Sequence, residues 1–229
     1  MKIFNLGLDI EQGKHKYKFE WVDKLVEKFL PQKISPYSVE FINSEPEIAD
    51  AVVFDLSKKL DLVIIDIEKI EKRLLRAEDE VEKTLLVKAQ KFLEEEKLLC
   101  DIEFAPSEVE TFKLLQLITC KPSLGVDKVS NIDELIKKII NKAGVLLFFT
   151  AGKKEVHVWS INKGESILEA AGKIHSDLKR GFIKGEVTNC KNLDSFFNMA
   201  EARAKGFVKI VDKDYIVEEG DIIEIRFNV

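Results

Sequence analysis

The sequence predicts two kinds of fold in one chain: an α/β layer interrupted by helices, followed by an α+β domain. Short apolar segments before residue 60 alternate with stretches of helical spacing, as in layered α/β proteins. Residues 61–99 contain no Gly or Pro and are crowded with Glu, Lys and Leu, which favours long helix. The chain ends in a segment where apolar and polar residues alternate, which is typical of a half-buried strand.

The α/β layer is predicted from five short segments in residues 1–60 and 114–145. Helical spacing is found in residues 21–29, which stop before Pro31, and in residues 132–140. Strands are predicted at residues 38–42, 51–54 and 122–126. The segment 51–54 is apolar enough to be a central strand that is buried on both faces.

Residues 61–113 form the predicted helical insertion. Its apolar residues recur at steps of three or four, namely Ile67, Ile70, Leu74, Ala77, Val81, Leu85, Ala89 and Phe92. Residues 77–80 lack a large apolar side chain, so we favour a coiled-coil hairpin over one long helix. The segment holds fifteen acidic and nine basic side chains. A solvated outer face explains the charges, and the apolar stripe suits a protein partner or a second copy of the chain.

The C-terminal region, residues 146–229, is predicted to be a β-grasp domain. Strands at residues 145–149 and 155–159 flank a turn at 151–154, and residues 166–174 have the spacing of a short packed helix. A turn at residues 218–221 precedes the alternating final strand. A hairpin, a helix, further strands and a buried last strand make an α+β arrangement of this type.

Composition excludes several classes of function. The formal net charge is −5, so the whole molecule is not an electrostatic binder of nucleic acid. Three distant cysteines, Cys100, Cys120 and Cys190, lack metal-ligand or redox spacing, which indicates free thiols in a reducing compartment. No apolar run is long enough for a signal peptide or a membrane span. We expect a cytoplasmic protein with no membrane contact, no metal and no cofactor.

Several linked blocks resemble a known family. Phe148-Phe149-Thr150-Ala151-Gly152, the stretches 170–177 and 180–183, and the ending at 214–221 and 226–228 resemble the TGS domain of YchF-type nucleotide hydrolases. Residues 61–74 and 115–122 are similar to that family's helical insertion and to the return into its GTPase domain. The resemblance implies a ubiquitin-like TGS domain behind a truncated P-loop-NTPase-like layer.

The nucleotide-binding motifs of that family are not matched. A phosphate loop needs G-x-x-x-x-G-K-[ST], whereas residues 7–15 have one residue too many and no hydroxyl. Asp9 and Glu11 would place negative charge beside phosphates. We therefore expect a hairpin or irregular turn, with a residual phosphate loop at Gly7, Gly13 and Lys14 as the alternative.

Two further family motifs are also altered. The magnesium-linked Asp-x-x-Gly falls at residues 43–46, which read Asn-Ser-Glu-Pro, and the base-recognition residues fall near Lys128 and Asn131. Phosphoryl transfer depends on positioned charge and metal. We therefore expect a degenerate pseudo-GTPase that is not an enzyme and has no catalytic residues.

A binding site is predicted in the TGS-like region. Residues that could grip a phosphate or an RNA backbone cluster after a helix end, and an aromatic ring is available for stacking: Trp159, His175, Asp177, Lys179, Arg180 and Lys184. The alternative is that His175 satisfies groups at the helix end and Trp159 belongs to the core. The predicted function is a binding or regulatory contact with RNA or a ribosome-associated protein. The alternatives are a residual ATP or GTP hydrolase and a small-nucleotide sensor.

Overall fold

The computed structural model describes residues 1–228 and divides into two compact units. Unit 1 comprises Met1–His15 and Val39–Ala143, and unit 2 comprises Lys16–Ser38 and the chain from Gly144 onward. The prediction of a mixed α/β fold is confirmed, since each unit contains one sheet with helices. The unit boundaries differ from the predicted domains, because Lys16–Ser38 lies with the C-terminal region.

Unit 1 is built on a five-stranded sheet in the order β2-β4-β1-β5-β6. Its strands are β1 (Lys2–Leu6), β2 (Gly13–Lys16), β4 (Ser38–Ile42), β5 (Ala51–Asp55) and β6 (Ser123–Val126). Strands β4, β1, β5 and β6 run parallel, so their carboxyl ends meet at one edge of the sheet. Residues 51–53 of β5 have no exposed surface, as a central parallel strand requires. Helix α5 (Ile132–Lys142) packs against β5 and β6.

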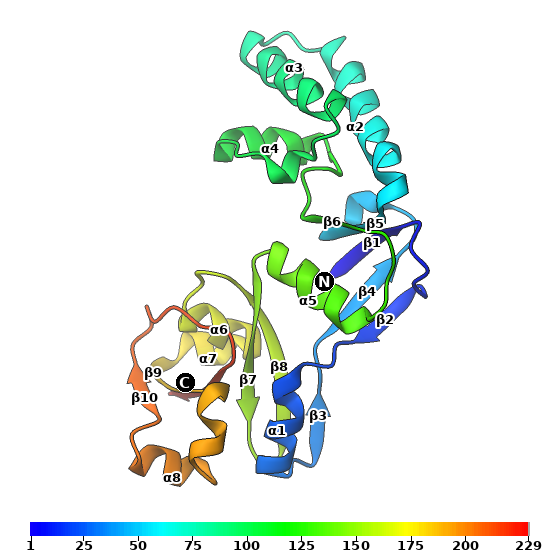
Figure 1. Cartoon of the computed structure of the whole chain (residues 1–229). Helices are drawn as coiled ribbons and strands as arrows, with labels where there is room; N and C mark the ends of the chain where they lie inside the picture. The colour runs from blue at the N-terminus through cyan, green and yellow to red at the C-terminus, as the bar shows by residue number, and fades with distance from the viewer. Residues whose placement is uncertain (229) are drawn as a thin grey trace. The chain divides into compact units, whose positions relative to one another are not determined.

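Three helices continue from this sheet: α2 (Lys59–Leu74), α3 (Glu80–Glu94) and α4 (Pro106–Leu114) (Figure 1). The chain turns between α2 and α3, where the Asp79 carboxylate accepts hydrogen bonds from the backbone N–H groups of Val81 and Glu82. Arg73 and Glu82 pair at 2.7 Å across the two packed helices. Short 3₁₀ turns lie at η1 (Pro46–Ile48), η2 (Leu56–Lys58) and η3 (Leu99–Asp101).

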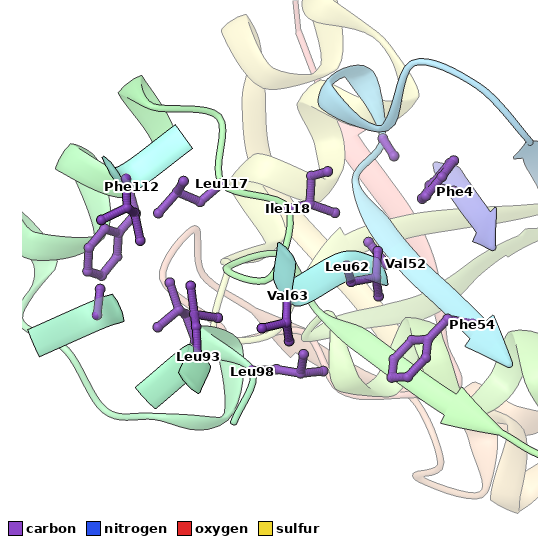
Figure 2. Close-up of a cluster of buried hydrophobic side chains, with 14 of the residues drawn as sticks. Phe4, Val52, Phe54, Leu62, Val63, Leu93, Leu98, Phe112, Leu117 and Ile118 are labelled. Atoms are coloured by element: carbon purple, nitrogen blue, oxygen red, sulfur yellow. The ribbon is translucent and has the colours of Figure 1, made fainter. Parts of the chain in front are cut away.

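The helices and the sheet of unit 1 share one hydrophobic core. Figure 2 shows Phe54 of β5 at one end of this cluster and Phe112 of α4 at the other, with Val63 and Leu93 between them. Asp66 of α2 is buried inside it and accepts hydrogen bonds from the backbone N–H groups of Ile118 (2.9 Å) and Thr119 (2.7 Å) and from the Thr119 hydroxyl (2.6 Å). The helical region therefore shares apolar packing with the sheet, and one of its carboxylates holds the segment that leads from α4 to β6.

Unit 2 contains a six-stranded sheet in the order β10-β9-β11-β7-β8-β3. Its strands are β3 (Lys33–Ser35), β7 (Val145–Ala151), β8 (Glu155–Asn162), β9 (Phe182–Asn189), β10 (Lys209–Val211) and β11 (Asp221–Phe227). Its helices are α1 (Glu20–Phe29), α6 (Ile167–Ile174), α7 (Ser176–Arg180) and α8 (Met199–Ala204), with a 3₁₀ segment at η4 (Cys190–Ser195). The predicted β-grasp assignment of residues 146–229 stays a prediction.

Helices cover both faces of this sheet. Ile167 and Ala170 of α6 pack in a cluster with Phe148 of β7. The next residue, Phe149, points to the opposite face because side chains alternate along a strand. On that face its ring stacks on the ring of Phe19, the residue just before α1, at a centroid distance of 5.8 Å. The segment Lys16–Ser38 thus supplies one of the two layers of unit 2. Among residues 1–228, no helix has the length and apolarity needed to cross a membrane.

Candidate functional site

The stretch nearest to a phosphate loop connects β1 with β2 and leads into a strand. Gly7 and Gly13 have φ angles of 82° and 125°, so both use backbone conformations that favour glycine. The Asn5 side chain closes the loop: its amide donates to the Leu8 carbonyl (3.0 Å) and its oxygen accepts from the Leu8 N–H (3.3 Å). Lys14 is exposed on β2. Because a strand follows, these residues provide no helix N-terminus for an anion.

The carboxyl edge of the parallel sheet is where ligands bind in open α/β folds. The stem of Lys58 lies over Gly7, since a Cβ atom at Gly7 would be 2.9 Å from its Cγ. Asp55 accepts hydrogen bonds from the N–H (2.8 Å) and hydroxyl (2.6 Å) of Ser57, and these bonds hold the pKa of Asp55 below its usual value. Lys58 also pairs with Asp61 at 3.2 Å. This edge therefore offers the ammonium group of Lys58, which is paired with Asp61, and the ionised carboxylate of Asp55, which is bonded to Ser57.

The turn after β4, where the magnesium-linked motif falls, holds an ammonium group. The Nζ atom of Lys121 donates to the carbonyl oxygens of Pro46 (2.9 Å), Glu47 (2.5 Å) and Ala49 (2.6 Å). Burial lowers the pKa of Lys121, and the nearby Glu47 carboxylate opposes that shift. The oxygens of this turn are thus already bound to a cation, and position 43 supplies an amide instead of a carboxylate. The residues present do not fit a magnesium ion here.

The three cations of the predicted RNA site are each neutralised by a carboxylate. The ion pairs are Lys179 with Glu169 (2.7 Å), Arg180 with Asp177 (2.9 Å) and Lys184 with Asp212 (2.5 Å). The Nδ1 atom of His175 accepts a hydrogen bond from the Asp177 N–H (3.1 Å), so His175 caps the short helix α7. The structure therefore gathers His175, Asp177, Lys179 and Arg180 around α7, where their charges are largely satisfied internally. Their role in binding stays a prediction.

Trp159 is partly buried against the core cluster of unit 2 and contacts side chains other than the predicted cations. The rings of His157 and Trp159 stack with centroids 3.8 Å apart and planes at 14°. The Trp159 Nε1–H donates to the Thr150 hydroxyl on β7 at 3.0 Å. Alternation along β8 could have predicted that residues 155, 157 and 159 share a face.

Edge strand β3 completes the cluster around Trp159. Glu155 accepts a hydrogen bond from the Ser35 hydroxyl (2.6 Å), pairs with Lys33 (2.9 Å) and lies 3.5 Å from the Nδ1 atom of His157. The hydrogen bonds from Ser35 and Lys33 keep the pKa of Glu155 below its usual value, so this carboxylate is ionised. Burial lowers the pKa of His157. Because β3 lies about 120 residues before β8, no local pattern could have revealed the pairing.

A cavity of about 420 Å³ lies beside this cluster in unit 2. It opens where β7 and β11 diverge, since Ile222 and Phe149 form the one β7–β11 pair found within residues 1–228. Its wall consists of residues 150–155, Ile174, Leu178, Met199 and residues 222–225. Thr150 and Glu155 belong both to this wall and to the cluster around Trp159.

Unit 1 has a larger hollow of about 620 Å³ between α3 and α4. Three of the carboxylates in its wall are engaged in ion pairs: Glu80 with Lys83, Glu82 with Arg73 and Glu108 with Lys88. Val81, also in the wall, is 76% exposed. Within residues 1–228, no group of three His, Cys, Asp or Glu side chains could hold a metal ion. Burial raises the pKa of the Cys120 and Cys190 thiols, which makes them poor nucleophiles.

Comparison with known proteins links the chain to one group of nucleotide hydrolases. Residues 145–228 match the family model YchF-GTPase_C, described as "Protein of unknown function (DUF933)". The "Ribosome-binding ATPase YchF" of Bacillus subtilis is 32% identical over 237 residues, covering 74% of this chain and 65% of that protein. "Obg-like ATPase 1" of Saccharomyces cerevisiae is 30% identical over 232 residues, covering 96% of this chain and 54% of that protein. The chain thus spans between about half and two thirds of these relatives' length.

A solved structure supports the same fold. The Schizosaccharomyces pombe YchF GTPase superposes with a TM-score of 0.77 at 19% sequence identity, covering 96% of this chain and 88% of that one. The relatives above are named ATPases, which points to an enzyme family. The expectation that this protein is not an enzyme is therefore wrong. That expectation was based on the altered motif positions alone, whereas the similarity to a protein named as an ATPase covers 74% of the chain.

Proposed function

We propose, on the premise that this chain is a member of the YchF/Obg-like ATPase family, that it associates with the ribosome. The match to the family model and the similarity to a bacterial and a yeast relative support that membership. One observation carries the proposal. A protein named "Ribosome-binding ATPase YchF" is 32% identical to this chain over 74% of its length.

We assign the ribosome contact to unit 2. Lys and Arg outnumber Asp and Glu by two in unit 2, whereas Asp and Glu outnumber Lys and Arg by seven in unit 1. A ribosome presents a largely anionic surface of RNA phosphates, which repels a strongly acidic unit and attracts a basic one. We also propose that residues 145–228, which match the family model, form a TGS domain of β-grasp type.

Co-sedimentation of the purified full-length protein with ribosomes tests the association. We expect the protein in the ribosomal pellet at low salt, with a bound fraction that falls as salt rises, because phosphate contacts release counterions. Sedimentation without ribosomes controls for aggregation. If the protein stays in the supernatant at every salt concentration, the proposed association is wrong.

The names of the relatives also favour ATP turnover as an activity of this chain. The phosphate-loop residues of the family are not matched, so we propose that a nucleotide binds at the carboxyl edge of the unit 1 sheet. Lys58, whose stem lies over Gly7, would supply the cation for its phosphates.

Phosphate release from ATP should therefore fall at least about tenfold in Lys58→Ala, since a charge-assisted contact contributes roughly 1.5 to 3 kcal/mol. Lys14→Ala tests the alternative phosphate loop, and Lys113→Ala, an exposed lysine on α4, is the matched control. Equal turnover in Lys58→Ala and Lys113→Ala would remove Lys58 from the site. ATP should also raise the melting temperature of the wild type by mass action.

A further inference from the structure

The turn between β7 and β8 is held in place by edge strand β3. The backbone N–H of Gln32 donates to the carbonyl of Lys153 (3.0 Å), and that of Lys33 donates to the carbonyl of Lys154 (3.2 Å). Within the turn, the Gly152 N–H donates to the Glu155 carbonyl at 3.0 Å. The backbone that carries Lys153 and Lys154 is therefore fixed on both sides. We call Lys33, Thr150, Lys153, Lys154, His157 and Trp159 the turn surface.

The turn surface carries uncompensated positive charge. Lys153 and Lys154 are exposed, and neither has an acidic group within ion-pair distance anywhere in residues 1–228. The cations around α7 differ, since each of them is paired with a carboxylate. An incoming anion therefore meets free ammonium groups at the turn, whereas at α7 it must compete with a bound carboxylate.

Aromatic rings lie next to these cations. The His157 ring stacks on Trp159, and the Thr150 hydroxyl fixes the indole through Nε1. The His157 side chain is 29% exposed, so part of its ring remains available to a partner. Burial lowers the pKa of His157, which leaves the ring neutral near pH 7. A neutral, partly exposed ring that is stacked on an indole suits contact with a nucleobase.

The neighbouring cavity adds an open, partly apolar hollow to the turn surface. Its wall includes Lys153 and Lys154 together with Ile174 and Leu178, so cations and apolar side chains border the same space of about 420 Å³. Thr150 and Glu155 connect this wall to the stacked rings. A ligand in which flat bases are linked by phosphates would match this combination of cations, apolar wall and stacked rings.

We propose that the turn surface binds a single-stranded segment of RNA. Lys153 and Lys154 contact its phosphates, and a base stacks on the His157–Trp159 pair. Single strands suit such a site because their bases are unstacked and can be splayed onto aromatic side chains. The inference rests on the proposed ribosome association, which brings the protein to an RNA-rich partner, and it names the surface and the chemistry of that contact.

Charge reversal tests the phosphate contacts. The affinity of the full-length protein for a fluorescently labelled single-stranded RNA is measured by anisotropy at several salt concentrations. We expect the double variant Lys153→Glu/Lys154→Glu to lose at least about tenfold in affinity and to flatten the slope of log K against log salt by about 1.4, since each phosphate contact contributes about 0.7 for single strands. Lys209→Glu/Lys213→Glu is the matched control, because Lys209 lies on β10, at the opposite edge of the same sheet, and Lys213 lies in the exposed turn after it.

Removal of the ring tests the stacking contact. His157→Ala should lower the affinity for the same RNA about tenfold while the salt slope stays unchanged, because stacking involves no counterion release. Trp159→Phe should retain most of the affinity, because an aromatic ring remains next to His157.

Three results would overturn the inference: equal losses in the two charge-reversal variants, an unchanged salt slope in Lys153→Glu/Lys154→Glu, or equally tight binding of an acidic peptide. The same variants in ribosome co-sedimentation separate the two proposals. If Lys153→Glu/Lys154→Glu still binds ribosomes and RNA like the wild type, the turn surface is wrong and ribosome association stands. If the wild type does not bind ribosomes but its RNA binding depends on Lys153 and Lys154, the proposed function fails and the turn surface stands.

Discussion

Two buried carboxylates, Asp66 in unit 1 and Glu186 in unit 2, are satisfied by opposite means. In unit 1, Asp66 has no exposed surface and accepts three hydrogen bonds, two from backbone N–H groups and one from a hydroxyl. In unit 2, Glu186 is 4% exposed and pairs with the guanidinium groups of Arg203 (2.6 Å) and Arg226. One carboxylate is held by neutral dipoles and the other by full positive charges.

This difference gives the two carboxyl groups opposite pKa shifts. Burial raises the pKa of Asp66, and its hydrogen bonds only partly oppose the shift. Burial also favours the neutral form of Glu186, but the two arginines outweigh it and hold the pKa below its usual value. The contribution of Glu186 to stability is thus present above its unfolded-state pKa and is lost as pH falls through the folded value. The contribution of Asp66 is present at low pH and is lost as pH rises through its folded value.

The largest expected effect is that of Asp66→Ala in unit 1. It leaves two backbone N–H groups and one hydroxyl without an acceptor inside the core, which should cost about 3 kcal/mol or more in the free energy of unfolding. Urea unfolding followed by helical circular dichroism measures this loss. Asp61→Ala on the same helix is the control, and we expect less than about 0.5 kcal/mol because Asp61 is half exposed.

Tryptophan fluorescence shows whether the loss is confined to unit 1. The two tryptophans, Trp21 and Trp159, both lie in unit 2, so their signal reports that unit. We expect the fluorescence transition of Asp66→Ala to stay close to that of the wild type. An equal shift in both signals would contradict the expectation that the loss is confined to unit 1.

Gly220→Ala should destabilise unit 2 by about 2 to 3 kcal/mol. Gly220 has a φ angle of 83°, and an added Cβ atom would lie 2.2 Å from the Trp21 ring, so strain and a steric clash combine. Gly206→Ala is a matched control, because φ is 75° there and nothing lies within 4 Å of the added atom. It should cost only about 1 kcal/mol. Similar losses in both variants, measured by tryptophan fluorescence, would show that Trp21 does not pack against Gly220.

Glu186→Gln should have the smallest effect, about 1 to 2 kcal/mol at neutral pH, because its arginine partners are about half exposed and solvent screens them. The difference from the wild type should shrink as pH falls through the folded pKa of Glu186, where the wild-type carboxylate takes up a proton. Glu224→Gln, an exposed partner of Arg203, should change stability by less than about 0.5 kcal/mol. A difference between Glu186→Gln and the wild type that is constant with pH would rule out the ionic account.

Elements with a strong local pattern were predicted well. The strand at residues 51–54 is buried on both faces, and the helical spacing at residues 132–140 corresponds to α5. The turn at residues 75–79 separates α2 from α3 because Asp79 caps the second helix. These features depend on residues close together in the chain, so their period, caps and turns are visible in the sequence.

The candidate site was predicted only in part. Trp159 was identified, but its partner is His157 and not His175, and the cations expected beside it are held by Glu169, Asp177 and Asp212. Ion pairs such as Lys179–Glu169 join neighbouring elements, so the sequence shows which charges exist without showing which of them remain free. Lys153 and Lys154 could be recognised as unpaired only in the folded unit.

By itself, the sequence determined the periodic elements, the acidic character of the helical region and the family resemblance of the last third, because each depends on residue types in local order. Only the tertiary structure decided that Lys16–Ser38 joins unit 2, that β3 fixes the turn at Lys153, and that Asp66 and Glu186 have opposite surroundings. The physical reason is that hydrogen bonds, desolvation and ion pairs depend on distances in space between residues that are far apart in the chain.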